Sequence, residues 1–212
     1  MSFRKRLVQF DVDSTFIQQE AIELLAAKAG VLPEVARITD SAMRGELDFA
    51  ESLTARVALL SGLSDSVIEQ VRAEITLTDG AAELVDSLHK DGHSVALVSG
   101  GFANIMQPIV DDLKIDYFRA NTLEIKDGVL TGKVVGPIID RAAKAHALRE
   151  FALDSQIELA DTVAIGDGAN DLDMMAIAGI SIAFNAKPIV IEAATFSITE
   201  PSLASVKSLI GL

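Results

Sequence analysis

The sequence contains no cysteine, no tryptophan, only one tyrosine and only five prolines among its 212 residues. Without cysteine the chain has no disulfide, no thiolate metal site and no thiol nucleophile, which fits our expected location, the reducing cytoplasm. No apolar run is long enough to span a membrane. The basic start, with Arg4, Lys5 and Arg6, leads into an apolar stretch that is too short for a signal peptide.

Positive charge is also scarce. The chain has 18 Lys and Arg against 31 Asp and Glu, a net charge of −13. An acidic surface repels nucleic acids and anionic membranes, so we expect neither as a partner. It also repels phosphate esters, so any site for such an ester must supply positive charge locally. The sequence does not indicate an oligomeric state.

Apolar runs typical of buried strands alternate with helical patterns along most of the chain. The predicted strands are 7–10, 94–98, 162–165, 180–184 and 196–198, with a hairpin of 122–125 and 129–134 around Asp127-Gly128. The predicted helices are 80–90, 103–113, 140–152, 170–178 and 188–194. This alternation predicts an α/β fold, a Rossmann-like parallel sheet with helices on both faces.

One segment, residues 18–76, interrupts the alternation because it shows only amphipathic helical patterns. An all-helical insertion directly after the first strand is most simply a small cap over the strand ends, where it would close on a substrate and exclude water. The alternative is a helical layer that only completes the core. We therefore expect a core domain of residues 1–17 and 77–212 and a helical cap of residues 18–76.

Two acidic segments follow predicted strands at opposite ends of the chain. The first is Asp11-Val12-Asp13-Ser14-Thr15 and the second is Gly166-Asp167-Gly168-Ala169-Asn170-Asp171. Ligands of open parallel sheets bind beyond the carboxyl ends of the strands, so these carboxylates would converge there. Oxygen ligands without cysteine indicate a hard cation, which we expect to be Mg²⁺. In the alternative interpretation, these acids and Asn170 only cap the helices that follow.

The same residues suit phosphoryl transfer. One carboxylate attacks phosphorus to give an aspartyl phosphate, while its neighbour acts first as general acid and then as general base on water. Ser99-Gly100-Gly101, at the end of a predicted strand, would cradle phosphate with a hydroxyl and backbone N–H groups, although it is also an ordinary turn sequence. Lys144 would supply positive charge, although most lysines are simply solvated.

These four segments, in this order, resemble the haloacid-dehalogenase superfamily, and the likeness to its phosphoserine phosphatases extends over essentially the whole chain. Further matching residues lie in the predicted cap and near the end of the chain: Thr15, Phe16, Glu20, Met43, Gly45, Phe49, Arg56, Phe102 and the segment 183–188. The resemblance implies Mg²⁺-dependent hydrolysis of O-phospho-L-serine to L-serine and phosphate, a step of serine biosynthesis.

The resemblance also implies individual roles. Asp11 would be the nucleophile and Asp13 the general acid and base. The metal would be held by Asp11, the main-chain carbonyl of Asp13, and Asp167. Phosphate would be bound by Ser99, Gly100, Lys144 and Asn170, and Asp171 would support Lys144 and the metal. In the cap, Glu20 would pair with the substrate ammonium and Arg56 with its carboxylate. Met43 and Phe49 would form an apolar wall.

Other functions stay open at this point. The same scaffold could transfer phosphate to homoserine or hydrolyse another small phosphorylated metabolite. In the alternative interpretation of the cap residues, Glu20 and Arg56 are solvated surface charges. A binding protein without catalysis would be expected to lack Asp11 or Asp13, and both are present. Because little chain precedes the first strand, we do not expect an N-terminal regulatory domain.

Overall fold

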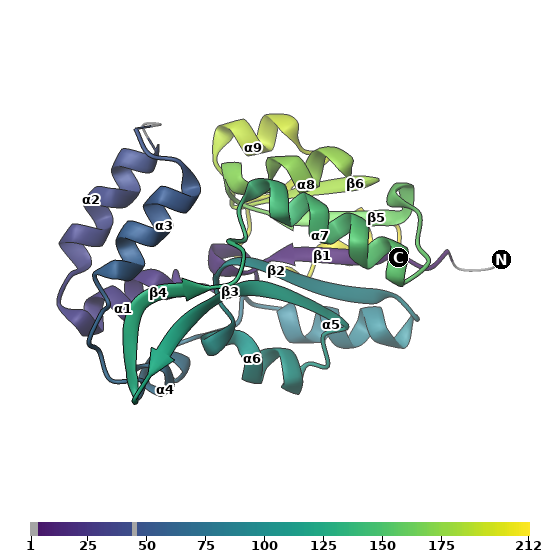
Figure 1. Cartoon of the computed structure of the whole chain (residues 1–212). Coiled ribbons are helices and arrows are strands. Elements are labelled where there is room, and N and C mark those ends of the chain that lie inside the picture. The colour runs from purple at the N-terminus through teal and green to yellow at the C-terminus, as the bar shows by residue number, and fades with distance from the viewer. Residues whose placement is uncertain (1–3, 44–45) are drawn as a thin grey trace.

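The structure is a computed structural model that describes residues 4–43 and 46–212 (Figure 1). The strands are β1 (Leu7–Asp11), β2 (Ser94–Phe102), β3 (Tyr117–Lys126), β4 (Val129–Val135), β5 (Thr162–Gly166), β6 (Ile180–Phe184) and β7 (Phe196–Ile198). The helices are α1 (Ala21–Ala29), α2 (Leu32–Met43), α3 (Phe49–Ala58), α4 (Val67–Arg72), α5 (Ala81–Lys90), α6 (Ala103–Asp112), α7 (Arg141–Asp154), α8 (Leu172–Ile177), α9 (Pro188–Ala193) and α10 (Val206–Leu209).

Among the described residues, one seven-stranded sheet runs in the order β4-β3-β2-β1-β5-β6-β7. All neighbouring strands are parallel except β3 and β4, which form the antiparallel hairpin. The predicted α/β fold with a mostly parallel sheet is therefore confirmed. The chain order reverses at β1, which lies between β2 and β5, so β1 marks the switch point where ligands of such sheets bind.

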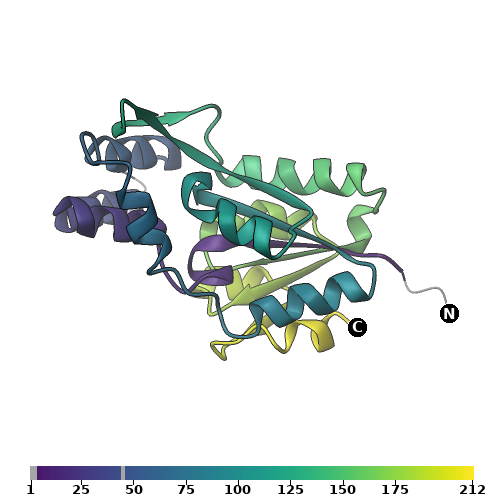
Figure 2. The ribbon, with the colours of Figure 1, turned by 90° about the horizontal axis from the view of Figure 1, so that it is seen from below.

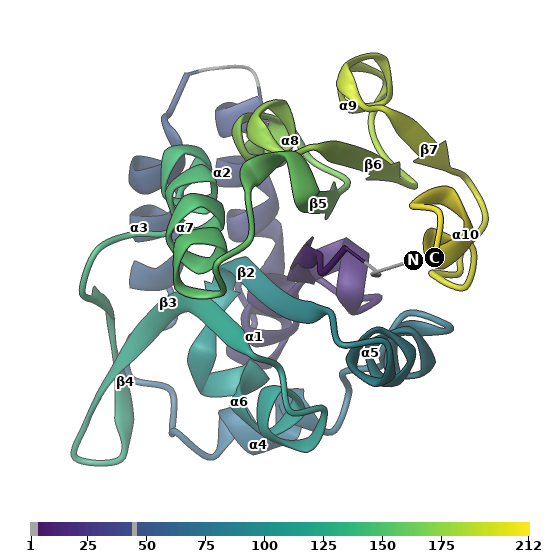
Figure 3. The same cartoon turned by 90° about the vertical axis from the view of Figure 1, so that its right-hand side faces the viewer.

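Helices cover both faces of the sheet, as Figure 3 shows when the strands are viewed nearly end-on. The apolar side chains of α5, α6 and α10 pack against one face, which Figure 2 presents to the viewer. Those of α7, α8 and α9 pack against the other face. Buried on both sides, β1 has no exposed position, which explains why its sequence reads as a continuous run rather than an alternation.

Helices α1–α4 lie together at one end of the sheet, and the C-terminus lies at the other end (Figures 1 and 2). They share a third apolar cluster with β3, β4 and α6 that includes Leu25, Leu53, Leu60 and Val71. The chain enters and leaves this helical segment through two antiparallel connections, because Gln18 N–H donates to the Thr76 carbonyl (3.0 Å) and Thr78 N–H to the Phe16 carbonyl (2.9 Å).

Three predictions of local structure were wrong in detail. Ser99-Gly100-Gly101 does not end the strand, because β2 continues to Phe102 with an irregular register against β3 after Ser99. The first half of β3 was not predicted; its first four residues are only half-buried, and it lacks a clear apolar run. For α4, the sequence predicts a helix over 67–75 with Ser64 as its N-cap; the helix does begin at Val67, but its N-cap is Ser66 and it ends at Arg72. No helix among the described residues is both long and apolar enough to cross a bilayer.

Candidate active site

The carboxyl end of β1 carries the first acidic segment. After Asp11 the chain makes a tight turn, closed by a hydrogen bond from Ile17 N–H to the Val12 carbonyl (2.9 Å), with Ser14 in the left-handed region at φ 58°. This turn directs the side chain of Asp13 toward α1, where one carboxylate oxygen accepts a hydrogen bond from Ala21 N–H (2.8 Å). Asp13 therefore reaches both the sheet and the helical segment.

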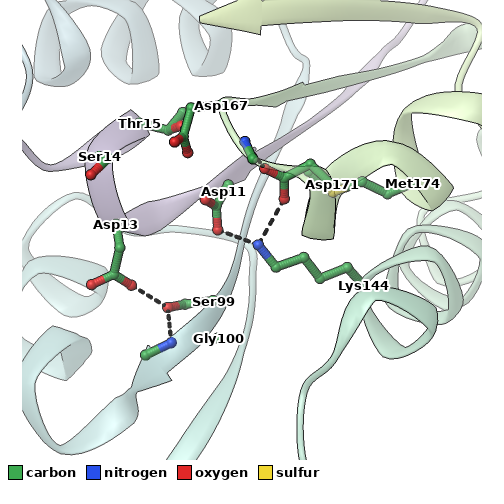
Figure 4. Close-up of polar contacts among 12 residues, drawn as sticks. Asp11, Asp13, Ser14, Thr15, Ser99, Gly100, Lys144, Asp167, Asp171 and Met174 are labelled. Carbon is green, nitrogen blue, oxygen red and sulfur yellow. Dashed lines mark hydrogen bonds and ion pairs between the residues drawn. The ribbon is translucent and has the colours of Figure 1, made fainter. Parts of the chain in front are cut away.

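Lys144 joins the two acidic segments from the first turn of α7. Its side chain is fully buried, and its ammonium donates to Asp11 Oδ1 and to Asp171 Oδ1, the latter at 2.7 Å (Figure 4). Burial disfavours the ammonium, but the carboxylates of Asp11 and Asp171 outweigh that effect and raise the pKa of Lys144 above its ordinary value. The solvated alternative for Lys144 is therefore excluded.

A cluster of carboxylates surrounds this ammonium. Oxygen atoms of Asp11, Asp167 and Asp171 all lie within 4.8 Å of one another. Burial raises the pKa of Asp11 well above its usual range, and the charges of Asp171 and Asp167 add to this shift while Lys144 opposes it. Burial and Asp171 likewise raise the pKa of Asp167. One ammonium does not balance these acids, so the donor set fits a hard divalent cation.

The second acidic segment depends on glycine for its shape. A Cβ atom on Gly166, at the end of β5, would lie 2.4 Å from the Asp171 carboxylate, and one on Gly168 would lie 2.2 Å from Asn170 Oδ1. The N–H of Gly168 donates to Asp171 Oδ2 (3.1 Å), and Thr15 Oγ1 donates to Asp167 Oδ1 (3.2 Å). The loop therefore folds directly over its own side chains and is tied back to the β1 turn.

Ser99 lies beside this cluster within β2. It is buried, its hydroxyl donates to Asp13 Oδ2 (2.9 Å), and it accepts a hydrogen bond from Gly101 N–H (2.7 Å). Of the backbone N–H groups expected to cradle phosphate in this segment, that of Gly101 is already bonded to Ser99. The hydroxyl holds Asp13 in place instead.

A cavity of about 600 Å³ lies above these groups, between the strand ends and helices α1–α3. Its floor includes Asp11, Asp13, Gly100, Asp167 and Asn170, and its roof includes Glu20, Phe49 and Arg56. Phe49 covers Gly100 so closely that a Cβ on this glycine would lie 2.9 Å from the ring. The side chain of Met43 lies outside the described residues, as do Arg44 and Gly45.

The two charged residues of the roof, Glu20 and Arg56, both have shifted pKa values. Glu20 accepts a hydrogen bond from Ser14 Oγ (2.5 Å), and burial together with the charge of Asp13 raises its pKa to about 7. Burial lowers the pKa of Arg56, and the charge of Glu20 opposes this shift. The Nε of Arg56 donates to the Ser52 carbonyl (3.2 Å). Both side chains line the cavity, so neither is a freely solvated surface charge.

Several residues around the cavity were not predicted as site residues. Thr15 and Ser14 orient Asp167 and Glu20, while Arg141 and Lys187 add positive charge to the cavity wall. Ser14 and Thr15 adjoin the predicted acids, which was the available signal. Lys187 lies in the segment 183–188 that matched the family, although no role was assigned to it. Arg141 carried no sequence signal of its own, because it reaches the cavity only through the placement of α7.

A mostly parallel sheet with acids and a buried lysine gathered beyond the carboxyl ends of its central strands defines an α/β protein with a ligand site at the switch point of the sheet. Comparison with known proteins identifies it further: residues 8–176 match the family of haloacid dehalogenase-like hydrolases, and the chain belongs to this family. The expected superfamily is therefore confirmed.

Two similar proteins and one similar solved structure are phosphoserine phosphatases by name. The chain is 55% identical over 208 residues to the phosphoserine phosphatase of Streptomyces coelicolor, covering 98% of this chain and 51% of that protein. It is 52% identical over 206 residues to that of Streptococcus thermophilus, covering 97% and 96%. A solved structure described as a phospho-aspartyl intermediate analogue of phosphoserine phosphatase superposes with a TM-score of 0.91 at 44% identity, covering 97% and 99%. The chain thus spans about half the length of the Streptomyces protein and nearly all of the Streptococcus protein and of the solved structure.

Proposed function

We propose that this chain hydrolyses O-phospho-L-serine to L-serine and phosphate through an aspartyl phosphate on Asp11, and thereby serves serine biosynthesis in the cytoplasm. One observation carries the proposal: the buried ammonium of Lys144 is bonded to Asp11 at the floor of a cavity whose roof holds both Glu20 and Arg56. The names of the relatives, and the phospho-aspartyl analogue among the similar structures, support the same reaction.

In this reaction Asp11 attacks phosphorus and displaces the serine oxygen, and water then attacks the aspartyl phosphate to release phosphate. Asp13 protonates the leaving serine oxygen and afterwards takes a proton from the water. Its two oxygens are held by Ser99 Oγ at 2.9 Å and by Ala21 N–H at 2.8 Å, which fixes it on the substrate side of the turn.

The phosphate is bound by Lys144, Gly100 and Asn170 together with Ser99, which acts mainly through Asp13. The metal is Mg²⁺, held by Asp11, the main-chain carbonyl of Asp13 and Asp167, with Asp171 supporting the site. When bound, the metal neutralises negative charge that Lys144 alone does not balance. The three clustered carboxylates and the raised pKa of Asp11 support this assignment.

The amino-acid part of the substrate is bound by the cap, residues 18–76. Glu20 pairs with its ammonium, Arg56 with its carboxylate, and Phe49 and Met43 form the apolar wall. An α-amino acid carries both charges on one carbon, so it requires one acid and one guanidinium near each other. Both are present in the roof. The cap of residues 18–76 joins the core of residues 1–17 and 77–212 through the two paired connections near Ile17 and Leu77.

Phosphate release from a panel of phosphorylated amino acids, acids and sugars tests the proposal, with homoserine added in one series as an alternative acceptor. We expect phosphoserine to be the preferred substrate, and Asp11→Asn to release no phosphate and trap no phosphoprotein. Formation of phosphohomoserine, or equal turnover of a sugar phosphate, would contradict it.

Arg56→Ala tests the substrate assignment. Turnover of phosphoserine should collapse, because its carboxylate loses its partner, whereas hydrolysis of a generic aryl phosphate should survive. Equal losses of turnover with both substrates would show that Arg56 does not bind the substrate carboxylate.

A further inference from the structure

Gln9 is a buried polar residue at the centre of the sheet. It lies in β1, two residues before Asp11, among apolar neighbours, and is fully inaccessible to solvent. Its Nε2 atom lies 3.2 Å from the main-chain carbonyl oxygen of Lys144 and 3.1 Å from Met174 Sδ. Its Oε1 atom finds no hydrogen-bond partner among the groups that the structure describes. A buried amide oxygen without a partner destabilises a folded protein, so an apolar residue would suit this position better for stability.

The contacts of Gln9 converge on the residues that hold Lys144 in the site. Side chains alternate along a strand, so Gln9 and Asp11 point to the same face of β1, toward α7 and α8. Gln9 contacts the main chain of Lys144 in α7 and the side chain of Met174 in α8, one turn after Asp171 (Figure 4 shows Met174 and Asp171). The ammonium of Lys144 bonds to Asp11 and Asp171 in the layer above.

The direction of the amide group follows from its partners. The Lys144 carbonyl is an acceptor and the Met174 thioether is a weak acceptor, so both require the NH₂ end of the amide. Turning the amide around would place Oε1 against the carbonyl oxygen. The donor end is therefore fixed toward α7 and α8, and the unsatisfied oxygen is the consequence of that arrangement.

We propose that Gln9 is a positioning residue for the reaction: it sets the spacing of β1 from α7 and α8 so that the Lys144 ammonium meets Asp11. This inference rests on the proposed function for the roles of Lys144 and Asp11. The residue acts through the main chain of Lys144 and touches no substrate. A core filler at this position would need no donor, and its replacement by an apolar isostere would leave the site unchanged.

The test is Gln9→Met, which keeps the volume and removes the donor. We expect kcat, measured where the variant is fully folded, to fall about tenfold or more while KM changes less than about twofold. The ¹⁵N–¹H signal of the Lys144 ammonium, assigned by its loss in Lys144→Met, should shift or broaden in Gln9→Met. The melting temperature should stay equal or rise, because an unpaired amide is removed.

Thr162→Val is the matched control, since it removes a hydrogen bond made by another buried side chain, from Thr162 Oγ1 to the Leu159 carbonyl (2.8 Å), at the opposite end of the sheet. It should lower the melting temperature and leave kcat and the Lys144 signal unchanged. An unchanged Lys144 signal in Gln9→Met, with or without a fall in kcat, overturns the proposal. If the wild type releases no phosphate, the proposed function fails, while the Lys144 signal still decides the role of Gln9.

Discussion

Lys144 carries a buried positive charge at the centre of the candidate site. Its ammonium is fully buried between Asp11 and Asp171 and lies near Asp167, so one cation is shared by a group of acids. A buried ion pair is weak evidence for stability, because desolvation opposes the attraction, but an incomplete pair is strongly destabilising. The arrangement is therefore better understood as part of a ligand site that also needs a divalent cation than as a device for stability.

Replacing Lys144 with Met should abolish most of the activity and destabilise the fold. Asp11 and Asp171 lose their shared partner, so we expect kcat to fall about a thousandfold and the free energy of unfolding at pH 8 to drop by about 3–5 kcal/mol. The loss of stability should shrink at pH 5, because protonation removes the repulsion between the two carboxylates. Phosphate release and chemical denaturation at both pH values measure this.

Lys90→Met is the control for that experiment. Lys90 pairs with Asp86 on the surface of α5, and its side chain is 71% exposed. It should leave both kcat and stability nearly unchanged. A comparable loss in Lys90→Met, or full activity in Lys144→Met, would contradict the role of the buried lysine.

Glu20 should make substrate binding depend on pH near neutrality. Its pKa is raised to about 7, so below that pH it is mostly protonated and cannot pair with an ammonium. We expect the KM for phosphoserine to rise as the pH falls from 8 to 6, and Glu20→Gln to have a higher KM that is flat over this range. A wild-type KM that does not change between pH 6 and 8 would contradict the assignment.

The same group also affects stability, with a defined sign. The folded state binds a proton at Glu20 that the unfolded chain releases above its ordinary pKa of 4.5, so this residue lowers stability as the pH rises from 4.5 to about 7. The full effect is at most about 3 kcal/mol. In metal-free protein, Glu20→Gln should flatten the stability profile over this window in chemical denaturation at several pH values.

At the scale of elements, the irregular end of β2 is the part of the sheet that serves the site. Its register against β3 shifts after Ser99, and strand irregularities of this kind re-aim side chains near active sites. There Ser99 turns toward Asp13, and Phe49 of α3 covers Gly100. The sheet and the helical segment thus meet at two consecutive residues of one strand.

Gly101→Ala should misplace the proton donor. The added Cβ would lie 2.6 Å from Asp13 Oδ2 and 3.0 Å from Ser99 Oγ, so the carboxylate must move. We expect kcat to fall about a hundredfold, with a smaller change in KM. Steady-state kinetics at a fixed Mg²⁺ concentration measures the effect.

Gly92→Ala provides the comparison. Gly92 has φ +80° with no atom within 4 Å of an added Cβ, so this change should cost about 1 kcal/mol of stability and leave kcat unchanged. If Gly101→Ala keeps full activity, the position of Asp13 does not depend on this close approach.

At the scale of the whole molecule, charge is the dominant property. The net charge is −13, yet the proposed substrate is a phosphate ester. The cavity lining includes three positive side chains, Arg56 of α3, Arg141 of α7 and Lys187 beside α9. The same lining carries five acids, Asp11, Asp13, Glu20, Glu23 and Asp167, so a dianion would still be repelled without a bound cation.

Removal of the metal should therefore affect stability as well as activity. We expect near-complete loss of turnover in EDTA, restored by excess Mg²⁺, and a melting temperature that rises with Mg²⁺ concentration, because binding to clustered carboxylates stabilises the folded state. Asp167→Asn should weaken the thermal response to Mg²⁺. Full activity in chelator, or a melting temperature independent of Mg²⁺, would contradict a metal at this site.

The local sequence predicted the parts of the fold that depend on short-range patterns. Strands β1, β5 and β6 and helices α5 and α7 lie within two residues of their predicted bounds, because continuous apolar runs and amphipathic helices are strong signals. The first half of β3 was missed, since its partly exposed side chains are ordered by pairing with β2 and by long-range contacts such as that of Tyr117 with Phe151 of α7. The predicted domain division at residues 17 and 77 stays a prediction, although helices α1–α4 do fall between these positions.

By itself, the sequence determined which acids, which lysine and which glycines are present, and their places after strands predicted their convergence. Only the tertiary structure decided their pairing: Lys144 bonds to Asp11 and Asp171, Ser99 holds Asp13, and Gln9 reaches across to α7. The reason is physical. Convergence follows from the common edge of parallel strands, whereas a hydrogen bond or a pKa depends on burial and on distances between residues that lie far apart in the chain.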